Sequence, residues 1–136
     1  MAVLPLDEFG VLQKGLLILI VDDEEIIRGL LCEVLEAEGF VTHALANADQ
    51  ALDFLKRESL AVGLLLTDIN MPGSIDGADL VNISTRVWPL IPVVVMSGVE
   101  TLRSAGIAHA AWFLRKPFDI EIMVTCVRNA LGGSSS

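Results

Sequence analysis

Cysteine is scarce in this sequence, and its two cysteines do not form a recognisable pair. Cys32 and Cys126 each lie within an apolar helical pattern. Disulfide frameworks and metal sites need more cysteines at closer, regular spacing. Both residues are therefore predicted to be small hydrophobic side chains in or near a core, which suits the reducing cytoplasm.

The sequence also lacks a long apolar run. A membrane-spanning helix needs about 18 or more consecutive apolar residues, whereas the run at 15–21 is short and is followed directly by Asp22 and Asp23. The N-terminus has no basic start with a long apolar segment, as a secretory signal peptide would. We therefore expect a cytoplasmic protein without membrane contact.

Basic residues are few, because 9 Lys and Arg stand against 18 Asp and Glu, for a formal net charge of −9. So acidic a chain repels phosphate backbones, which argues against direct nucleic-acid binding. Hydrophobic residues make up 53% of the 136 residues, enough for the core of one domain. We expect an N-terminal extension at 1–14, one domain at 15–131, and a flexible tail or artificial remnant at 132–136.

Apolar runs of strand length alternate with helical patterns along the chain. Several strands are apolar at nearly every position, which indicates burial on both faces, as in a parallel sheet. The repeated strand–helix order predicts an open, doubly wound α/β fold. Strands are predicted at 16–21, 40–44, 62–67, 92–96 and 112–114. Helices are predicted at 25–38, 48–58, 76–87 and 119–131, with a short and less certain one around 100–105.

Two of the predicted helices carry apolar residues three or four positions apart, which predicts one buried face on each. The last helix also has apolar residues on a second side, Ile122 and Cys126, which leaves open a homodimer or partner face or simply a wide buried stripe. The predicted buried faces are Ile26, Ile27, Leu30, Leu31, Val34 and Leu35 in the first helix, and Ile120, Met123, Val124, Val127 and Leu131 in the last.

Short polar side chains follow four of the five predicted strands. Asp22 and Asp23 follow the first strand, Asp68 the third, Ser97 the fourth and Lys116 the fifth. Ligands of open α/β sheets bind beyond the carboxyl ends of the strands. We therefore expect these five side chains to converge at one rim.

Three carboxylates at one rim repel one another, and a hard divalent cation such as Mg²⁺ offsets that repulsion. The backbone carbonyl near Asn70 could add a ligand, and Lys116 supplies a second positive charge. A carboxylate beside both cations, here Asp68, can accept a phosphoryl group, to which Ser97 could donate a hydrogen bond.

Each of these residues also has an ordinary interpretation. Asp22 or Asp23 could end a strand or cap the next helix, and Asp68 could be a turn residue before Pro72 and Gly73. Lys116 could be a solvated lysine. These interpretations weaken together, because the predicted topology brings all the residues to one rim.

The sequence resembles the response-regulator receiver domains, the phosphoacceptor modules of two-component signalling. The resemblance covers residues 16–131 and implies a flavodoxin-like (βα)5 fold with a five-stranded parallel sheet in the order 2-1-3-4-5. The segments that carry it are ILIVDDEEIIR, LLLTDINMPGSIDGADLV, VVVMSG and FLRKPFD.

The resemblance also implies a role for each residue at the rim. Asp68 would be the phosphorylated residue. Asp22, Asp23 and Asp68 would hold Mg²⁺ with the backbone carbonyl of Asn70, and Lys116 would contact the phosphoryl group by its charge.

Further roles implied by the resemblance concern the conformational switch. Ser97 would hydrogen-bond the phosphoryl group, and Phe113 would be the aromatic residue that swings inward when Ser97 moves. The Lys116–Pro117 peptide bond is expected to be cis. The sequence departs from the family pattern in two places. The segment MPGSIDG is one residue longer than the common spacing. The segment at 99–111 is short and rich in Ala and Gly, which leaves open whether a regular fourth helix forms there.

By this resemblance the chain accepts a phosphoryl group from a histidine kinase or a histidine phosphotransfer protein. It then changes surface conformation to control an unidentified downstream protein, either as a stand-alone regulator or as part of a larger one. Two alternatives are a pseudo-receiver that only docks partners and a haloacid-dehalogenase-type phosphatase. The phosphatase would need a second Asp two residues after Asp68, where this chain has Asn70.

Overall fold

The structure is a computed structural model that describes residues 17–98 and 111–132. The predicted N-terminal extension at 1–14, the short helix around 100–105 and all but the first residue of the predicted tail lie outside the described residues. The elements are β1 (Leu17–Val21), α1 (Glu25–Ala37), β2 (Val41–Leu45), α2 (Ala48–Glu58), a 3-10 turn (Ser59–Ala61), β3 (Val62–Asp68), α3 (Gly77–Val87), β4 (Val93–Ser97), β5 (Trp112–Arg115) and α4 (Ile120–Leu131).

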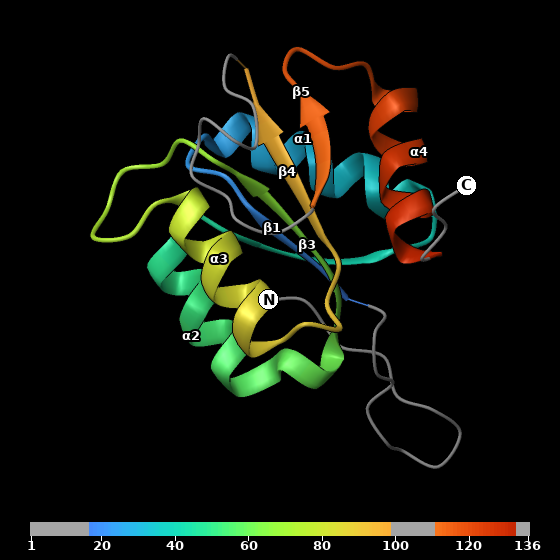
Figure 1. Ribbon diagram of the computed structural model, residues 1–136. Coiled ribbons are helices and arrows are strands. Elements are labelled where there is room, and N and C mark those ends of the chain that lie inside the picture. Colours follow the sequence, from blue (N-terminus) through green and yellow to red (C-terminus); the bar gives the residue numbers. More distant parts are fainter. Residues whose placement is uncertain (1–16, 99–110, 133–136) are drawn as a thin grey trace.

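The five strands form one parallel sheet in the order β2-β1-β3-β4-β5. Helices α2 and α3 cover one face of the sheet and α1 and α4 cover the other (Figure 1). This confirms the predicted doubly wound α/β fold and its strand order. No helix within the described residues is long and apolar enough to cross a membrane.

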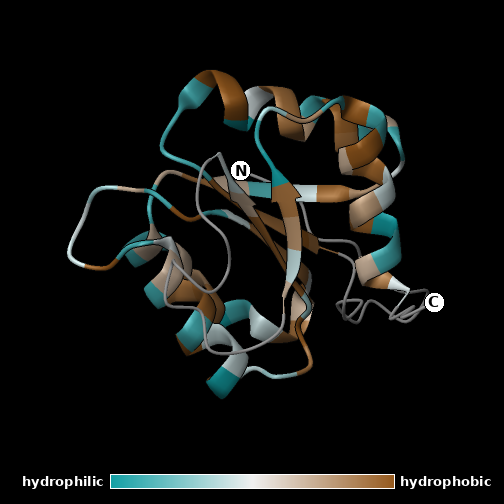
Figure 2. Cartoon of the chain, turned by 45° about the horizontal axis from the view of Figure 1, so that its top comes forward, coloured by the Kyte–Doolittle hydropathy of each residue, from teal (hydrophilic) through white to brown (hydrophobic). Residues whose placement is uncertain are grey.

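The core has two layers, one on each face of the sheet. In β1, Leu17, Leu19 and Val21 belong to the layer under α2 and α3, whereas Ile18 and Ile20 belong to the layer under α1 and α4. Successive side chains of a strand point to opposite faces, so a strand covered on both faces must be apolar throughout. The strands are accordingly mostly hydrophobic, and the hydrophilic residues are concentrated in the helices and in the loops between elements (Figure 2).

Three residues of the predicted helix faces are more exposed than expected, and the prediction was wrong for them. Ile26 is 85% exposed, Leu30 45% and Ile120 49%. At 3.6 residues per turn Ile26 lies about 180° around α1 from the buried Leu35 and therefore faces solvent. Ile120 is on the buried side of α4, but it is the first helical residue and no preceding turn covers it.

Helices α2, α3 and α4 begin at residues whose side chains cap them, whereas α1 has no side-chain cap. The Asn47 side chain accepts a hydrogen bond from Gln50 N at 2.8 Å and so caps α2. Asp119 caps α4 in the same way, and Asp76 forms a reciprocal capping box with Asp79 at the start of α3. These caps fix where the loop before each of these helices must end.

Candidate functional site

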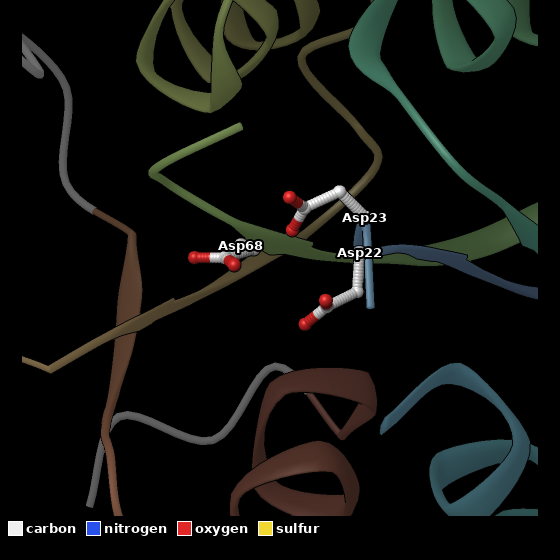
Figure 3. A group of neighbouring side chains, drawn as sticks. All are labelled: Asp22, Asp23 and Asp68. Carbon is white, nitrogen blue, oxygen red and sulfur yellow. The ribbon is translucent and has the colours of Figure 1, made fainter. Parts of the chain in front are cut away.

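Three carboxylates meet at the carboxyl ends of the two central strands. Asp22 follows β1 directly, and Asp68 is the last residue of β3. These strands are hydrogen-bonded neighbours in register. One oxygen from each of Asp22, Asp23 and Asp68 lies within 4.8 Å of the others, and the three side chains leave the strand ends together (Figure 3).

An ammonium group lies between two of these carboxylates. Lys116 Nζ is 3.2 Å from Asp68 Oδ2 and 3.4 Å from Asp22 Oδ2. The backbone of Lys116 is held in place by a hydrogen bond from its N–H to the carbonyl oxygen of Ser97 at 2.8 Å. The Lys116–Pro117 peptide bond is cis. The loop after β5 is thus tied to the end of β4 and places its lysine over the acidic group.

Backbone N–H groups orient the two buried carboxylates. Glu24 N donates to Asp22 Oδ1 at 2.9 Å, and Asn70 N donates to Asp68 Oδ1 at 3.2 Å. Asp22 is 0% exposed and Asp68 is 6% exposed, whereas Asp23 is exposed. Buried carboxylates need such partners, because an unpaired buried charge is costly. The arrangement leaves one exposed and two buried carboxylates facing a common space.

The electrostatics of the site favour a cation. Burial raises the pKa of Asp68, and the nearby charge of Asp22 adds to this, although Lys116 and the Asn70 N–H oppose it. Burial works to lower the pKa of Lys116, but the charges of Asp68 and Asp22 outweigh burial and raise it. When all are ionised, three carboxylates (−3) and one ammonium (+1) leave a net charge of −2.

The donor set therefore fits a hard divalent cation. All three side chains offer carboxylate oxygens, which Mg²⁺ prefers, and its charge would cancel the residual −2. The exposed position of Asp23 leaves the site open to solvent and to a substrate oxygen. The structure thus brings together four of the residues predicted for the site: Asp22, Asp23, Asp68 and Lys116.

The other predicted residues lie near this group. Ser97 ends β4, is 1% exposed and accepts the Lys116 N–H through its carbonyl oxygen. Asn70 is exposed and contacts Asp68 through its N–H. Phe113 lies on β5, opposite Val95 of β4, and is 36% exposed. Trp112, its neighbour, packs against the layer under α1 and α4.

Gly77 lies against the backbone of Asp68, a role that its sequence pattern alone did not predict. A Cβ atom at this position would lie 1.9 Å from the Asp68 carbonyl oxygen and 2.6 Å from Ile69 Cα. The Gly77 N–H also donates to the Ile69 carbonyl oxygen at 3.1 Å. Only glycine lets the start of α3 approach the backbone of Asp68 so closely. The Asp-Gly pair at the predicted start of the helix was the available signal.

The longer loop after Asp68 folds against α2. Ser74 Oγ donates to both carboxylate oxygens of Asp49, at 2.8 and 3.0 Å. Gly73 has a φ of +136°, a conformation that favours glycine. The extra residue of the MPGSIDG segment is therefore accommodated by a turn that bonds to the first turn of α2.

An apolar groove of about 560 Å³ adjoins the lysine side of the site. Its lining includes Ile27, Leu30 and Leu31 of α1, Pro117 and Phe118 of the loop after β5, and Lys116, which also contacts the acidic group. The exposure of Leu30, which the helix pattern did not predict, follows from its position at this groove.

The sequence of the chain matches a known protein family. Residues 18–128 match the family described as response regulator receiver domain. The chain belongs to this family. A putative NtrX-like response regulator of Rickettsia felis is 38% identical over 117 residues, 83% of this chain. The DNA-binding transcriptional regulator NtrC of Escherichia coli is 33% identical over 123 residues.

Solved structures agree with this assignment. The receiver domain of NtrX from Brucella abortus is 33% identical and superposes with a TM-score of 0.77, covering 86% of this chain and 99% of that one. A response regulator receiver protein from Sinorhizobium medicae is 28% identical with a TM-score of 0.78 over 87% of this chain and 95% of that one. The chain spans about a quarter of the length of the curated relatives, 24% of the Rickettsia protein and 25% of the Escherichia coli protein.

Proposed function

We propose that this receiver domain accepts a phosphoryl group on Asp68 with the help of Mg²⁺. The observation that carries the proposal is the position of Lys116 Nζ, which contacts both Asp22 and Asp68 beside a third carboxylate. A lysine and a cation-binding group beside one carboxylate can neutralise the charge on a phosphoryl group that is transferred to that carboxylate. The proposed cation ligands are Asp22, Asp23, Asp68 and the Asn70 carbonyl.

The chemistry of the transfer follows from the charges at the site. An Asp68 carboxylate oxygen forms a bond to phosphorus while the bond from phosphorus to the donor histidine nitrogen breaks, and the imidazole keeps that electron pair. Lys116 interacts with the phosphoryl oxygens by its charge, since its ammonium already lies beside Asp68. Mg²⁺ held by Asp22, Asp23, Asp68 and the Asn70 carbonyl would supply further charge neutralisation. Hydrolysis of the acyl phosphate would reset the domain.

The response to phosphorylation is proposed to run from Ser97 to Phe113. Ser97 ends the strand that neighbours β5, and the two strands are paired in register from Val94 to Ser97. A shift of Ser97 toward a phosphoryl group would therefore act on the strand that carries Phe113. The partial exposure of Phe113 leaves this ring room to change position.

The groove beside Lys116 is the surface on which we propose that the phosphodonor docks. A donor protein bound at this apolar surface would lie next to Lys116, whose ammonium contacts Asp68. A histidine kinase or a histidine phosphotransfer protein is the donor expected for this family. The downstream protein is not identified. The exposed Ile122 of α4 offers a surface for a homodimer.

Two other functions have less support. A phosphatase with an aspartyl nucleophile would need an acid where Asn70 stands, and the Asn70 contact to Asp68 is made by its backbone N–H. A pseudo-receiver would not need the acidic group and the lysine, yet both are assembled here. The geometry therefore favours a working phosphoacceptor.

Incubation with Mg²⁺ and acetyl phosphate tests the proposal. We expect one acid-labile phosphoryl group per chain, mapped to Asp68 by mass spectrometry of hydroxylamine-treated peptides, and much less labelling when the metal is chelated. Asp68→Asn should abolish the labelling. Asp53→Asn, at an exposed acid of α2, should be labelled like the wild type. Labelling at another residue, or none with both reagents present, would rule out the proposed function.

A further inference from the structure

We propose that Arg28 is a positioning residue for the cation site and acts through the main chain of Asp22; this inference rests on the proposed function of that site. Arg28 lies on α1 and belongs to the segment ILIVDDEEIIR, but none of the roles above uses it. Its Nη1 donates a hydrogen bond to the Asp22 carbonyl oxygen at 2.8 Å.

This contact completes the set of partners around Asp22. The Asp22 N–H donates to the carbonyl oxygen of Leu45 at 3.2 Å, Oδ1 accepts from Glu24 N, and Oδ2 faces Lys116 Nζ. Because Asp22 is fully buried, each of its polar groups needs a partner within the protein. Arg28 supplies the partner for the carbonyl oxygen.

That carbonyl belongs to the peptide unit between Asp22 and Asp23. A hydrogen bond to this peptide restrains ψ of Asp22 and φ of Asp23, two of the torsions that set where their side chains leave the backbone, and these are two of the three carboxylates of the acidic group. A residue that orients metal ligands without touching the metal often has a large effect on affinity. Arg28 therefore sets the geometry of two carboxylates through one hydrogen bond.

The charge of Arg28 makes the inference easy to test. A guanidinium this close to the site repels a divalent cation, so its charge alone weakens Mg²⁺ binding. Its hydrogen bond, by orienting the carboxylates, strengthens Mg²⁺ binding. If the charge dominates, removal of Arg28 strengthens Mg²⁺ binding. If the hydrogen bond dominates, removal weakens Mg²⁺ binding, and this is the result that we expect.

Isothermal titration of the full chain with Mg²⁺ measures this directly. We expect Arg28→Met to weaken Mg²⁺ binding by about tenfold. Arg28→Lys keeps the charge but replaces the planar guanidinium fork with a single ammonium, so we expect a smaller loss of affinity. The matched control is Arg57→Met, which also removes an arginine bonded to a backbone carbonyl (Asp53 O, 3.3 Å) but in the last turn of α2. Its affinity should equal that of the wild type.

The possible results are distinct. Binding by Arg28→Met that is as tight as in the wild type, or tighter, would overturn the inference. If urea unfolding shows that Arg28→Met is not folded, the Mg²⁺ affinity of Arg28→Lys is the test. An affinity weaker than that of the wild type supports positioning, because the charge has not changed. An affinity equal to that of the wild type overturns the inference. Absence of Mg²⁺ binding by the wild type would instead refute the proposed function of the site.

Discussion

Replacement of Gly77 by alanine is expected to lower the free energy of unfolding by about 3 kcal/mol. The added Cβ would lie 1.9 Å from the carbonyl oxygen of Asp68 and 2.6 Å from Ile69 Cα, and both are backbone atoms that cannot rotate away. Either α3 or the end of β3 must move. Because the obstructed carbonyl belongs to Asp68, we also expect phosphoryl labelling to fall sharply. Urea unfolding and acetyl phosphate labelling measure the two effects.

Gly29→Ala provides the matched control for this substitution. Gly29 lies on the exposed side of α1, and a Cβ there would have no atom within 4 Å. Since alanine is a better helix former than glycine, the free energy of unfolding of this variant should rise by about 0.5–1 kcal/mol, and its phosphoryl labelling should equal that of the wild type. A Gly77→Ala protein as stable and as readily labelled as the wild type would contradict the close approach of α3 to Asp68.

Asp68→Asn is expected to raise the free energy of unfolding of the metal-free protein at neutral pH. Burial raises the pKa of Asp68, so its ionised form destabilises the fold relative to its neutral form. For an acid whose pKa is raised on folding, the folded state holds more protons between the two pKa values, and stability falls as pH rises through that window. This pH window runs from the ordinary aspartate pKa of 3.8 to the raised pKa of Asp68 in the folded protein. Below the window the advantage of asparagine should disappear.

With Mg²⁺ bound, the wild type should become more stable than Asp68→Asn. A ligand that binds only the folded state adds about 2.7 kcal/mol of stability at a concentration one hundred times its dissociation constant. The wild type should gain this stability, and Asp68→Asn, which lacks one of the three carboxylates, should gain little. Urea unfolding of both proteins with and without Mg²⁺, at several pH values, measures the crossover. An Asp68→Asn variant that is less stable than the wild type without metal would contradict the electrostatic account.

Much of the fold could be predicted because burial on both faces leaves a strong pattern. The continuous apolar strands identified a covered parallel sheet, and the carboxyl ends of its strands then located Asp22, Asp68 and Lys116 at one rim. Helix faces were less predictable. The apolar spacing in α1 is compatible with burial of Ile26, but only the packing against the sheet decides which side of the helix turns inward, and Ile26 faces solvent.

The contacts that hold the site could not be read from the sequence. The need for glycine at position 77 depends on how closely α3 approaches β3, which is a tertiary distance. The Arg28 contact joins a side chain to a main-chain carbonyl, so no pair of matching residue types marks it. The bond from Ser74 to Asp49 likewise depends on how the longer loop folds. Residue types indicated the chemistry of the site, and three-dimensional packing determines how it is positioned.

The proposed function depends on the three carboxylates and Lys116 forming one site for a cation and a phosphoryl group. A crystal structure of the chain grown with Mg²⁺ and beryllofluoride, a phosphoryl mimic, would show whether they do. The account predicts the beryllofluoride on a carboxylate oxygen of Asp68 and within reach of Lys116 Nζ, with the metal bound by Asp68 and at least one of Asp22 and Asp23. Metal and beryllofluoride bound elsewhere, with Lys116 turned away from Asp68, would contradict it.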